Sequence, residues 1–195
     1  MIAIVDYDCG NIRSVKNALQ RLGADYTLTD DPAELRHAER LILPGVGSDD
    51  RAIDSLRRKG LVDVIKRIRR PVLGICVGMQ VMCRDSEEGP CEGMGIFDAH
   101  VSRFKAEPGL KIPHMGWDTI ANCESKLLRG LPPQSYVYFV HSYRANLCPD
   151  TIATCRYGKD MFSAALKYEN FYGTQFHPEK SGDVGELILK NFLEL

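Results

Sequence analysis

The sequence lacks any apolar run long enough to cross a membrane, and it carries no excess of positive charge. Its longest uninterrupted apolar run, residues 72–79, falls far short of the ~20 residues that span a bilayer. Lysine and arginine number 25 against 26 aspartate and glutamate, so no overall basic field is available for nucleic acid or an anionic membrane. Residues 1–6 have no basic leader and reach an acid after a very short apolar stretch. We therefore predict no signal peptide, no membrane span, no nucleic-acid partner and a cytoplasmic location.

Paired cysteines and nucleotide-binding motifs are absent as well. The seven cysteines are odd in number and scattered, and no Cys-x-x-Cys pair occurs. This pattern argues against a disulfide framework and against a structural zinc site. Neither a Walker motif nor a Gly-x-Gly-x-x-Gly motif occurs, so nothing supports nucleotide binding. We expect no metal and no cofactor, and mostly reduced thiols that pack as small hydrophobes.

What the chain does contain is typical of one α/β domain over residues 1–195, with no linker, repeat or low-complexity stretch. Apolar, β-branched runs at residues 2–5, 41–43 and 72–75 predict buried strands. Apolar positions at helical spacing predict helices between them, one beginning at Asp31-Pro32 and one interrupted near Gly60. This alternation predicts an open, mostly parallel or mixed sheet with helices on both faces.

The pattern changes near residue 95. Strand-like segments there are expected to extend the same sheet in antiparallel or mixed order, and they lie at residues 96–104, 136–140, 152–157, 163–166 and 171–176. A helix carrying the apolar residues of the segment 184–193 is expected to close the fold. Residues 84–95, rich in acids and glycine, are expected to form a surface loop.

Ligands in open parallel sheets gather where strands end, and Gly74-Ile75-Cys76-Val77-Gly78 follows one such strand. It has the form of a nucleophile elbow, the strand-to-helix turn Gly-x-Ser-x-Gly, with cysteine in place of serine. The positive end of a helix dipole favours a thiolate, and the following N–H of Val77 is free to stabilise an oxyanion. A tight turn with a buried thiol would explain this motif alone equally well, so a partner motif must decide.

That partner is the segment 175–180, which contains His177-Pro178-Glu179. Proline biases His177 toward an extended backbone, in which residues two apart project to the same side. An imidazole oriented by a carboxylate can then exchange protons with a thiol. Of the other histidines, His37 lies in a charged helical stretch that we expect to be exposed, and His100 lies in a strand-like run where we expect no acidic partner. His114 and His141 have no acid one to three residues away.

A second glycine-rich turn, Pro44-Gly45-Val46-Gly47, follows the strand 41–43. Glycine lets backbone amides approach a ligand closely, so this turn could supply a second oxyanion donor one strand from the elbow.

Together the turn 44–47, the elbow 74–80 and the segment 175–179 resemble the class I, triad-type glutamine amidotransferases in order and spacing. Finer features resemble one branch, the glutaminase subunits of imidazole glycerol phosphate synthase. They are Gly-Val-Gly at 45–47, Gly-Met-Gln at 78–80, Pro-His-Met-Gly-Trp at 113–117 and Tyr-Phe-Val-His-Ser-Tyr at 138–143. The resemblance covers essentially the whole chain and implies a flavodoxin-like fold.

The resemblance implies hydrolysis of L-glutamine to glutamate and ammonia by a Cys-His-Glu triad. Cys76 would attack the side-chain carboxamide and form a glutamyl thioester. His177 would protonate the departing ammonia and later activate water, while Glu179 holds the imidazole. Oxyanion donors are implied at Val77 and at Gly45 or Val46. The glutamine contacts implied by the resemblance are Gly47, Gln80, Ser142 and Tyr143.

The resemblance also implies a heterodimer with a (β/α)₈-barrel cyclase. That partner combines the ammonia with a phosphoribulosyl-formimino carboxamide ribonucleotide, giving imidazole glycerol phosphate and an aminoimidazole carboxamide ribonucleotide in histidine biosynthesis. Trp117, the only tryptophan, resembles the family's interface anchor. Tyr138 and Lys180 match positions at the ammonia passage and the partner, and Asn11 is expected on the same docking face.

Two alternatives stay open. A related glutaminase could feed a different synthase, for example one that makes amidino-modified sugars, with the same triad. A catalytically inactive subunit could instead only dock to a partner. For a glutaminase, the triad, turn and glutamine contacts occupy the whole 195-residue chain, so we expect a separate protein to use the ammonia released.

Overall fold

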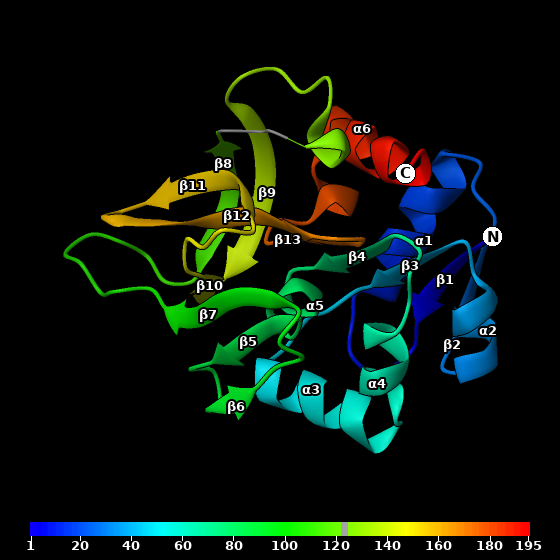
Figure 1. Cartoon of the computed structure of the whole chain (residues 1–195). Coiled ribbons are helices and arrows are strands. Elements are labelled where there is room, and N and C mark those ends of the chain that lie inside the picture. Colours follow the sequence, from blue (N-terminus) through cyan, green and yellow to red (C-terminus); the bar gives the residue numbers. More distant parts are fainter. Residues whose placement is uncertain (122–124) are drawn as a thin grey trace.

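The computed structural model describes residues 1–121 and 125–195. Its main sheet contains seven strands, β1 (Ile2–Val5), β2 (Tyr26–Thr29), β3 (Arg40–Leu43), β4 (Val72–Ile75), β11 (Thr151–Tyr157), β12 (Asp160–Tyr168) and β13 (Phe171–Thr174). They lie in the order β11-β12-β13-β4-β3-β1-β2 (Figure 1). The five strands from β13 to β2 are parallel, whereas β12 and β11 are antiparallel at one edge. The predicted open, mixed sheet is confirmed.

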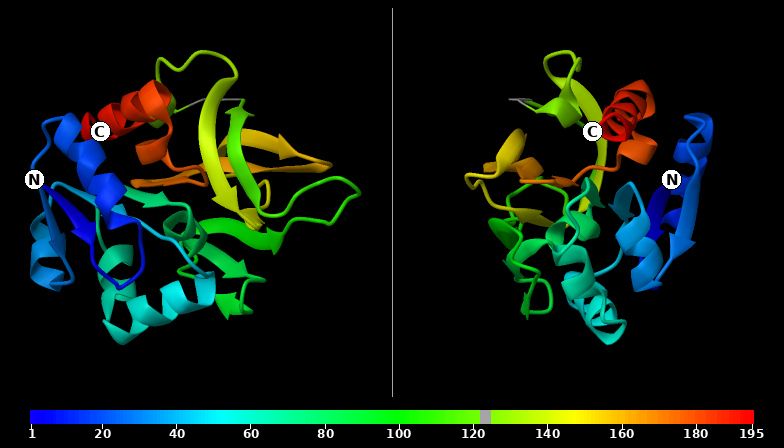
Figure 2. Two further views of the ribbon diagram at one scale, coloured as in Figure 1. Left: turned by 180° about the vertical axis from the view of Figure 1, so that it is seen from behind. Right: turned by 45° about the vertical axis from the view of Figure 1, so that its right-hand side comes forward.

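Helices cover both faces of this sheet, as predicted. They are α1 (Ile12–Arg21), α2 (Pro32–His37), α3 (Asp49–Arg58), α4 (Leu61–Lys66), α5 (Val77–Gln80) and α6 (Gly182–Leu193). Helices α1 and α6 lie on one face, and α2, α3 and α4 lie on the other (Figures 1 and 2). Asp31 caps α2 by accepting a hydrogen bond from the N–H of Ala33 at 2.8 Å. Gly60, at φ +66°, separates α3 from α4. Within the described residues, no helix is long and apolar enough to cross a membrane.

Two smaller sheets replace part of the predicted extension. One has four strands, β5 (Cys83–Ser86), β6 (Cys91–Glu92), β7 (Phe97–Arg103) and β10 (Tyr143–Ala145), and the other pairs β8 (His114–Ile120) with β9 (Ser135–His141). Segments 96–104 and 136–140 were expected in the main sheet, and that prediction is wrong. The surface loop expected at residues 84–95 is also wrong, because β5 and β6 pair there. A strand with one solvent-exposed face can carry charged residues, which in the sequence alone indicate a loop.

The helix after the elbow is short. It ends at Gln80, and the chain enters β5 at Cys83. Cys83 is fully buried, as expected of a thiol that packs as a small hydrophobe. Two short 3₁₀ turns, η1 (Lys126–Leu128) and η2 (Pro178–Lys180), precede and support α6.

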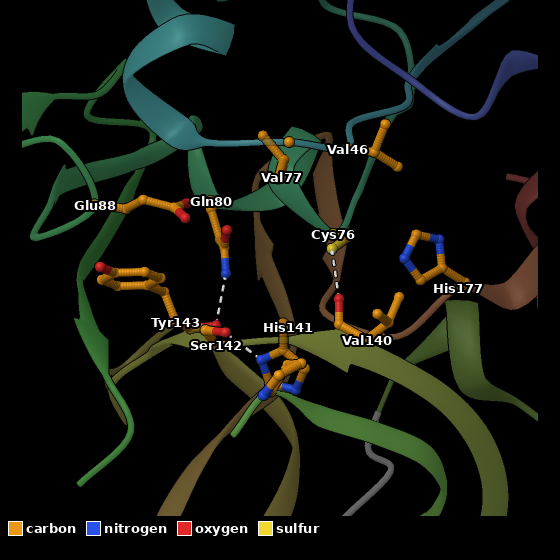
Figure 3. A pocket seen from close by; sticks show the side chains of 12 residues that line it. Val46, Cys76, Val77, Gln80, Glu88, Val140, His141, Ser142, Tyr143 and His177 are labelled. Atoms are coloured by element: carbon orange, nitrogen blue, oxygen red, sulfur yellow. Dashed lines mark hydrogen bonds between the residues drawn. The ribbon is translucent and has the colours of Figure 1, made fainter. Parts of the chain in front are cut away.

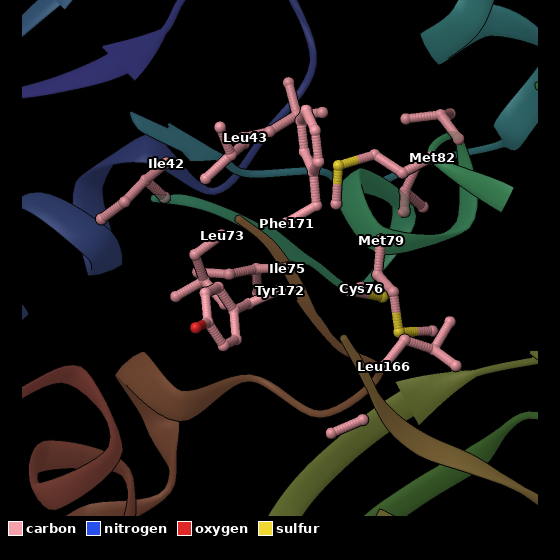
Figure 4. Packing of buried hydrophobic residues seen from close by; sticks show 14 of the residues in the cluster. Ile42, Leu43, Leu73, Ile75, Cys76, Met79, Met82, Leu166, Phe171 and Tyr172 are labelled. Carbon is pink, nitrogen blue, oxygen red and sulfur yellow. The ribbon is translucent and has the colours of Figure 1, made fainter. Parts of the chain in front are cut away.

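The core beneath the site is apolar on both sides of the central strands. Every residue of β1, β4 and β13 is buried, which explains the continuous apolar sequences of β1 and β4. Figure 4 shows Leu73, Ile75 and Met79 in this core, close to Cys76. The turn that carries Cys76 therefore packs on a dense apolar core.

Candidate active site

Three turns converge because they follow three neighbouring parallel strands. β3 pairs with β4, and β4 pairs with β13, all in the same direction. Their carboxyl ends therefore meet at one edge of the sheet. A cavity of about 340 Å³ opens there, and its lining includes Gly47, Cys76 and His177 (Figure 3). The structure thus brings together the elbow, the glycine turn and the histidine segment that the sequence singled out.

Cys76 has the strained backbone of a nucleophile elbow. Its φ of 55° and ψ of −112° lie where residues other than glycine are rare. The flanking glycines are required by the close approach of neighbouring backbone. A Cβ at Gly78 would lie 1.9 Å from the carbonyl oxygen of Leu43, and one at Gly74 would lie 2.6 Å from the carbonyl oxygen of Gly78. Strain of this kind lifts the thiol above the sheet.

The glycine turn packs directly against the elbow. A Cβ at Gly45 would lie 2.3 Å from the amide nitrogen of Gly78 and 2.8 Å from the carbonyl carbon of Val77. The buried Tyr7 hydroxyl donates a hydrogen bond to the carbonyl of Pro44 and so anchors the start of the turn. Val46 and Val77 both line the cavity. Both predicted oxyanion segments therefore border the cavity that Cys76 lines.

His177 and Glu179 form a buried pair. Nδ1 of His177 lies 2.8 Å from Oε1 of Glu179, and the two side chains are each 1% exposed. The predicted extended backbone holds for His177, at φ −96° and ψ 96°, but is wrong for Glu179, which lies in η2. The 3₁₀ turn, rather than an extended chain, therefore brings the carboxylate back to the ring. Among the described residues, Nε2 of His177 has no hydrogen-bond partner.

Electrostatics favour a charged imidazole at this position. Burial lowers the pKa of His177, but the negative charges of the Cys76 sulfur and of Glu179 outweigh it and raise the pKa to about 10. A protonated imidazole beside the sulfur stabilises a thiolate, which is the nucleophilic form of cysteine. The same proton is available for a leaving group.

The opposite wall of the cavity is built around Tyr143. Nε2 of Gln80 donates to the carbonyl of Tyr143 at 2.8 Å and to Oε1 of Gln175 at 3.0 Å. Both amide hydrogens of Gln80 are thus used within the protein, which leaves its carbonyl oxygen for a ligand. Ser142 and Tyr143 line the cavity, as does Gly47 on the other side. All four residues predicted to contact glutamine therefore lie at the cavity.

Sequence reasoning missed four lining residues, Glu88, Pro113, Val140 and His141. Glu88 lies between β5 and β6, in the segment predicted to be a surface loop. Its Oε2 accepts a hydrogen bond from the N–H of Asp49 at 3.1 Å, and partial burial raises its pKa. Glu88 lies in a charged stretch between Glu87 and Gly89, and nothing in this local sequence indicates that its side chain faces the cavity.

The remaining histidines differ from expectation in part. His37 is exposed at the end of α2, as predicted. His100 was expected to lack an acidic neighbour, which is wrong, because it contacts Asp85 and Glu87 across the β5–β7 pair. His114 and His141 are both buried, and His114 has an acidic neighbour in Asp118, four positions along β8.

Three of the predicted interface residues form one cluster, here called the docking cluster: Trp117, Tyr138 and Lys180. Trp117 is 55% exposed, its ring centroid lies 6.0 Å from that of Tyr138, and Nζ of Lys180 lies 5.8 Å from the Tyr138 ring. The cluster adjoins the catalytic segment, because the N–H of His177 donates to the carbonyl of Tyr138. Asn11 serves as the N-cap of α1, where its side chain accepts from the N–H of Ser14.

The six described cysteines are all free thiols. Cys123, the seventh, lies outside the described residues.

Known proteins resemble this chain over its whole length. The family model for glutamine amidotransferase class-I matches residues 3–195. Imidazole glycerol phosphate synthase subunit HisH of Bacteroides thetaiotaomicron is 49% identical over 195 residues, covering 100% of this chain and 99% of that protein. HisH of Yersinia pseudotuberculosis is 45% identical over 196 residues, with coverage of 100% and 99%.

Solved structures share the fold. A crystal structure of a glutamine amidotransferase superposes with a TM-score of 0.76 at 20% identity, covering 100% of this chain and 98% of that one. A structure of PurLQS from Thermotoga maritima gives 0.71 at 20% identity, with coverage of 99% and 97%. With a family match over nearly its whole length and full-length relatives near half identity, the chain belongs to the class I glutamine amidotransferases.

Proposed function

We propose that residues 1–195 form one glutaminase domain that hydrolyses L-glutamine to glutamate and ammonia through Cys76, His177 and Glu179. One observation carries this proposal. His177, held by the buried Glu179 at 2.8 Å, lines the same cavity as a cysteine on a strained elbow. That is the arrangement of nucleophile, base and orienting acid needed for acyl transfer.

The reaction proceeds in two stages. The Cys76 thiolate attacks the carboxamide carbon, and the N–H of Val77 with an amide of Gly45 or Val46 stabilises the oxyanion. His177 gives its proton to the departing ammonia, which leaves a glutamyl thioester on Cys76. His177 then takes a proton from water, the resulting hydroxide attacks the thioester, and glutamate departs as the thiolate re-forms. Glu179 holds the imidazole in one orientation throughout.

Recognition of glutamine falls to the cavity wall. Gly47, Gln80, Ser142 and Tyr143 supply polar backbone and side-chain groups around the sulfur. Glu88 is the acidic residue among those that line the cavity. Its carboxylate complements the α-ammonium group of an amino acid. Selection for the free amino acid over a simple amide would rest on this contact.

The ammonia is proposed to pass to a separate cyclase subunit of imidazole glycerol phosphate synthase, in a heterodimer that serves histidine biosynthesis. The names of the full-length relatives support this assignment. The docking cluster supports it physically, because an exposed tryptophan packed beside a tyrosine presents the aromatic side chains that protein interfaces favour. The cytoplasm, where the described thiols stay reduced, is the proposed location.

The function is tested by mixing the purified chain with the (β/α)₈-barrel cyclase from the same genome and measuring glutamate formation. Glutamine hydrolysis is expected to rise strongly when the cyclase and its ribonucleotide substrate are both present. Stimulation by another synthase instead would transfer the proposal to that pathway. A complex that forms but releases no glutamate would favour an inactive docking subunit.

Trp117→Ala is expected to weaken the complex with the cyclase by about 10- to 100-fold, because buried tryptophans dominate interface energies. Titration calorimetry measures the change in Kd. Tyr168→Ala is the matched control, since Tyr168 is a similarly exposed aromatic residue, 47% exposed, at the end of β12. Equal affinity of the two variants would remove the docking cluster from the interface.

A further inference from the structure

A row of three polar contacts runs from β8 to the wall of the cavity. Oδ2 of Asp118 lies 3.2 Å from Nε2 of His114, and Nδ1 of His114 lies 3.1 Å from Nε2 of His141. Nδ1 of His141 in turn lies 2.7 Å from the carbonyl oxygen of Tyr143. This row is here called the histidine relay. It begins one residue from Trp117 and ends on the carbonyl that also accepts from Gln80.

The relay is enclosed in aromatic packing. His114 is 3% exposed and its ring lies between those of Phe139 and Tyr157, with centroids 4.7 and 3.9 Å away. His141 is 7% exposed and packs against Phe104 at 5.1 Å. Two imidazoles in such a setting are costly unless each ring nitrogen has a partner. All four ring nitrogens have one here, but only because Tyr143 and Asp118 stand at the two ends.

Counting protons fixes the direction of the contacts. The carbonyl of Tyr143 can only accept, so Nδ1 of His141 carries a proton. Burial lowers the pKa of His141 to about 3, and His114, His177 and Arg144 add to this effect against the opposing hydrogen bond to Tyr143. His141 is therefore neutral, its Nε2 accepts, and Nδ1 of His114 donates to it.

The contact between His114 and Asp118 then needs a third proton. Nε2 of His114 faces a carboxylate oxygen of Asp118, and two neutral imidazoles supply only the two protons already placed. Burial lowers the pKa of His114 and the charge of Asp118 opposes that effect. The contact between Nε2 of His114 and Oδ2 of Asp118 therefore requires one further proton shared by these two atoms, and Oδ1 of Asp118 accepts a hydrogen bond from the N–H of Thr119 at 2.7 Å.

We propose that Asp118 and His114 are positioning residues that act through His141 to hold the Tyr143 carbonyl where glutamine binding requires it. The Ser142–Tyr143 wall is also held by Gln80 and by the N–H of Phe104, which donates to the carbonyl of Ser142 at 3.1 Å. Loss of the relay would remove one of these supports from the wall. This inference rests on the proposed glutaminase function, since glutamine is the ligand concerned.

The kinetic test compares three variants in complex with the cyclase. Asp118→Ala removes the contact between Asp118 and His114. It is expected to raise KM for glutamine about 3- to 10-fold with little change in kcat, because the triad is untouched. Asp118→Asn is expected to restore a near wild-type KM, because its amide N–H can donate to neutral His114. Thr119→Ala, the neighbouring residue on the opposite side of β8, controls for effects of the strand on docking.

A spectroscopic test separates the relay from simple packing. In protein labelled with ¹⁵N-histidine, His141 is expected to show a single tautomer with its proton on Nδ1, and Asp118→Ala is expected to let it exchange between tautomers. A proton on Nε2 of His141 in the wild-type protein would overturn the relay. A KM for Asp118→Ala within twofold of wild type, or matched by Thr119→Ala, would also overturn it. Absence of glutamine hydrolysis by the wild-type complex would instead refute the proposed function, and the tautomer measurement would still decide on the relay.

Discussion

Replacing Cys76 by alanine is expected to lower kcat for glutamine hydrolysis by at least about 10³-fold, because no covalent thioester can form without the sulfur. The assay is glutamate release by the complex with the cyclase at saturating glutamine. Cys91→Ala is the matched control, since Cys91 is a half-buried thiol on β6 that does not line the cavity. Its activity should stay within about twofold of wild type.

The same variant separates catalysis from assembly. Cys76→Ala should still bind the cyclase, and the complex should still use added ammonium, because the docking cluster and the partner's own site are unchanged. Hydrolysis of glutamine at the wild-type rate by Cys76→Ala would show that another group is the nucleophile.

Glu179→Gln is expected to reduce kcat by about 10³- to 10⁴-fold, since a neutral amide can neither enforce the His177 tautomer nor stabilise the imidazolium. The physical basis is the 2.8 Å contact between Oε1 and Nδ1 in a buried site. Glu186→Gln is the control, because Glu186 lies exposed on α6. Activity within tenfold of wild type would mean that Glu179 does not orient the base.

The Glu179 variant also has a pH signature. Burial lowers the pKa of His177, so the value of about 10 depends on the charges of Cys76 and Glu179. Removing the Glu179 charge should lower that pKa, which NMR titration of the ring measures. Because the folded-state pKa lies above the ordinary value of 6.5, the protonated ring stabilises the fold fully below pH 6.5 and loses this effect as the pH rises through about 10. The stability difference between wild type and Glu179→Gln should fade over the same interval.

The central part of the fold was predictable because its signals are local and strong. Strands β1, β3 and β4 are buried on both faces, so each appears as a short apolar run in the sequence. The turns that follow them carry glycines that no other residue can replace, as the clash at Gly78 shows. Parallel order then places the ends of neighbouring strands together, which is why Cys76 and the turn at Gly45 could be assigned to one site.

Other elements gave weaker local signals. Strand β2 is only half-buried and alternates threonine with larger residues at the sheet edge, so no apolar run marks it. The β5–β6 hairpin is built from polar residues whose pairing depends on β7 from farther along the chain. Glu88 enters the site only through that pairing.

The histidine relay depended on a contact across strands. His114 and His141 are opposite residues in the β8–β9 register, which sequence spacing does not reveal. Asp118 lies four positions from His114, beyond the one to three residues within which an orienting acid was sought. The His177–Glu179 contact likewise depends on the 3₁₀ turn η2 rather than on an extended chain.

The central claim is that this chain produces ammonia at Cys76 and delivers it directly to a cyclase. The most direct measurement supplies the complex with glutamine labelled with ¹⁵N in the amide, in the presence of excess unlabelled ammonium, and determines the isotope in the imidazole product. We predict that the new ring nitrogen carries mostly the ¹⁵N label at a pH low enough to keep free ammonia scarce. A label diluted to the level of the bulk ammonium, or product formed only from that ammonium, would contradict the account.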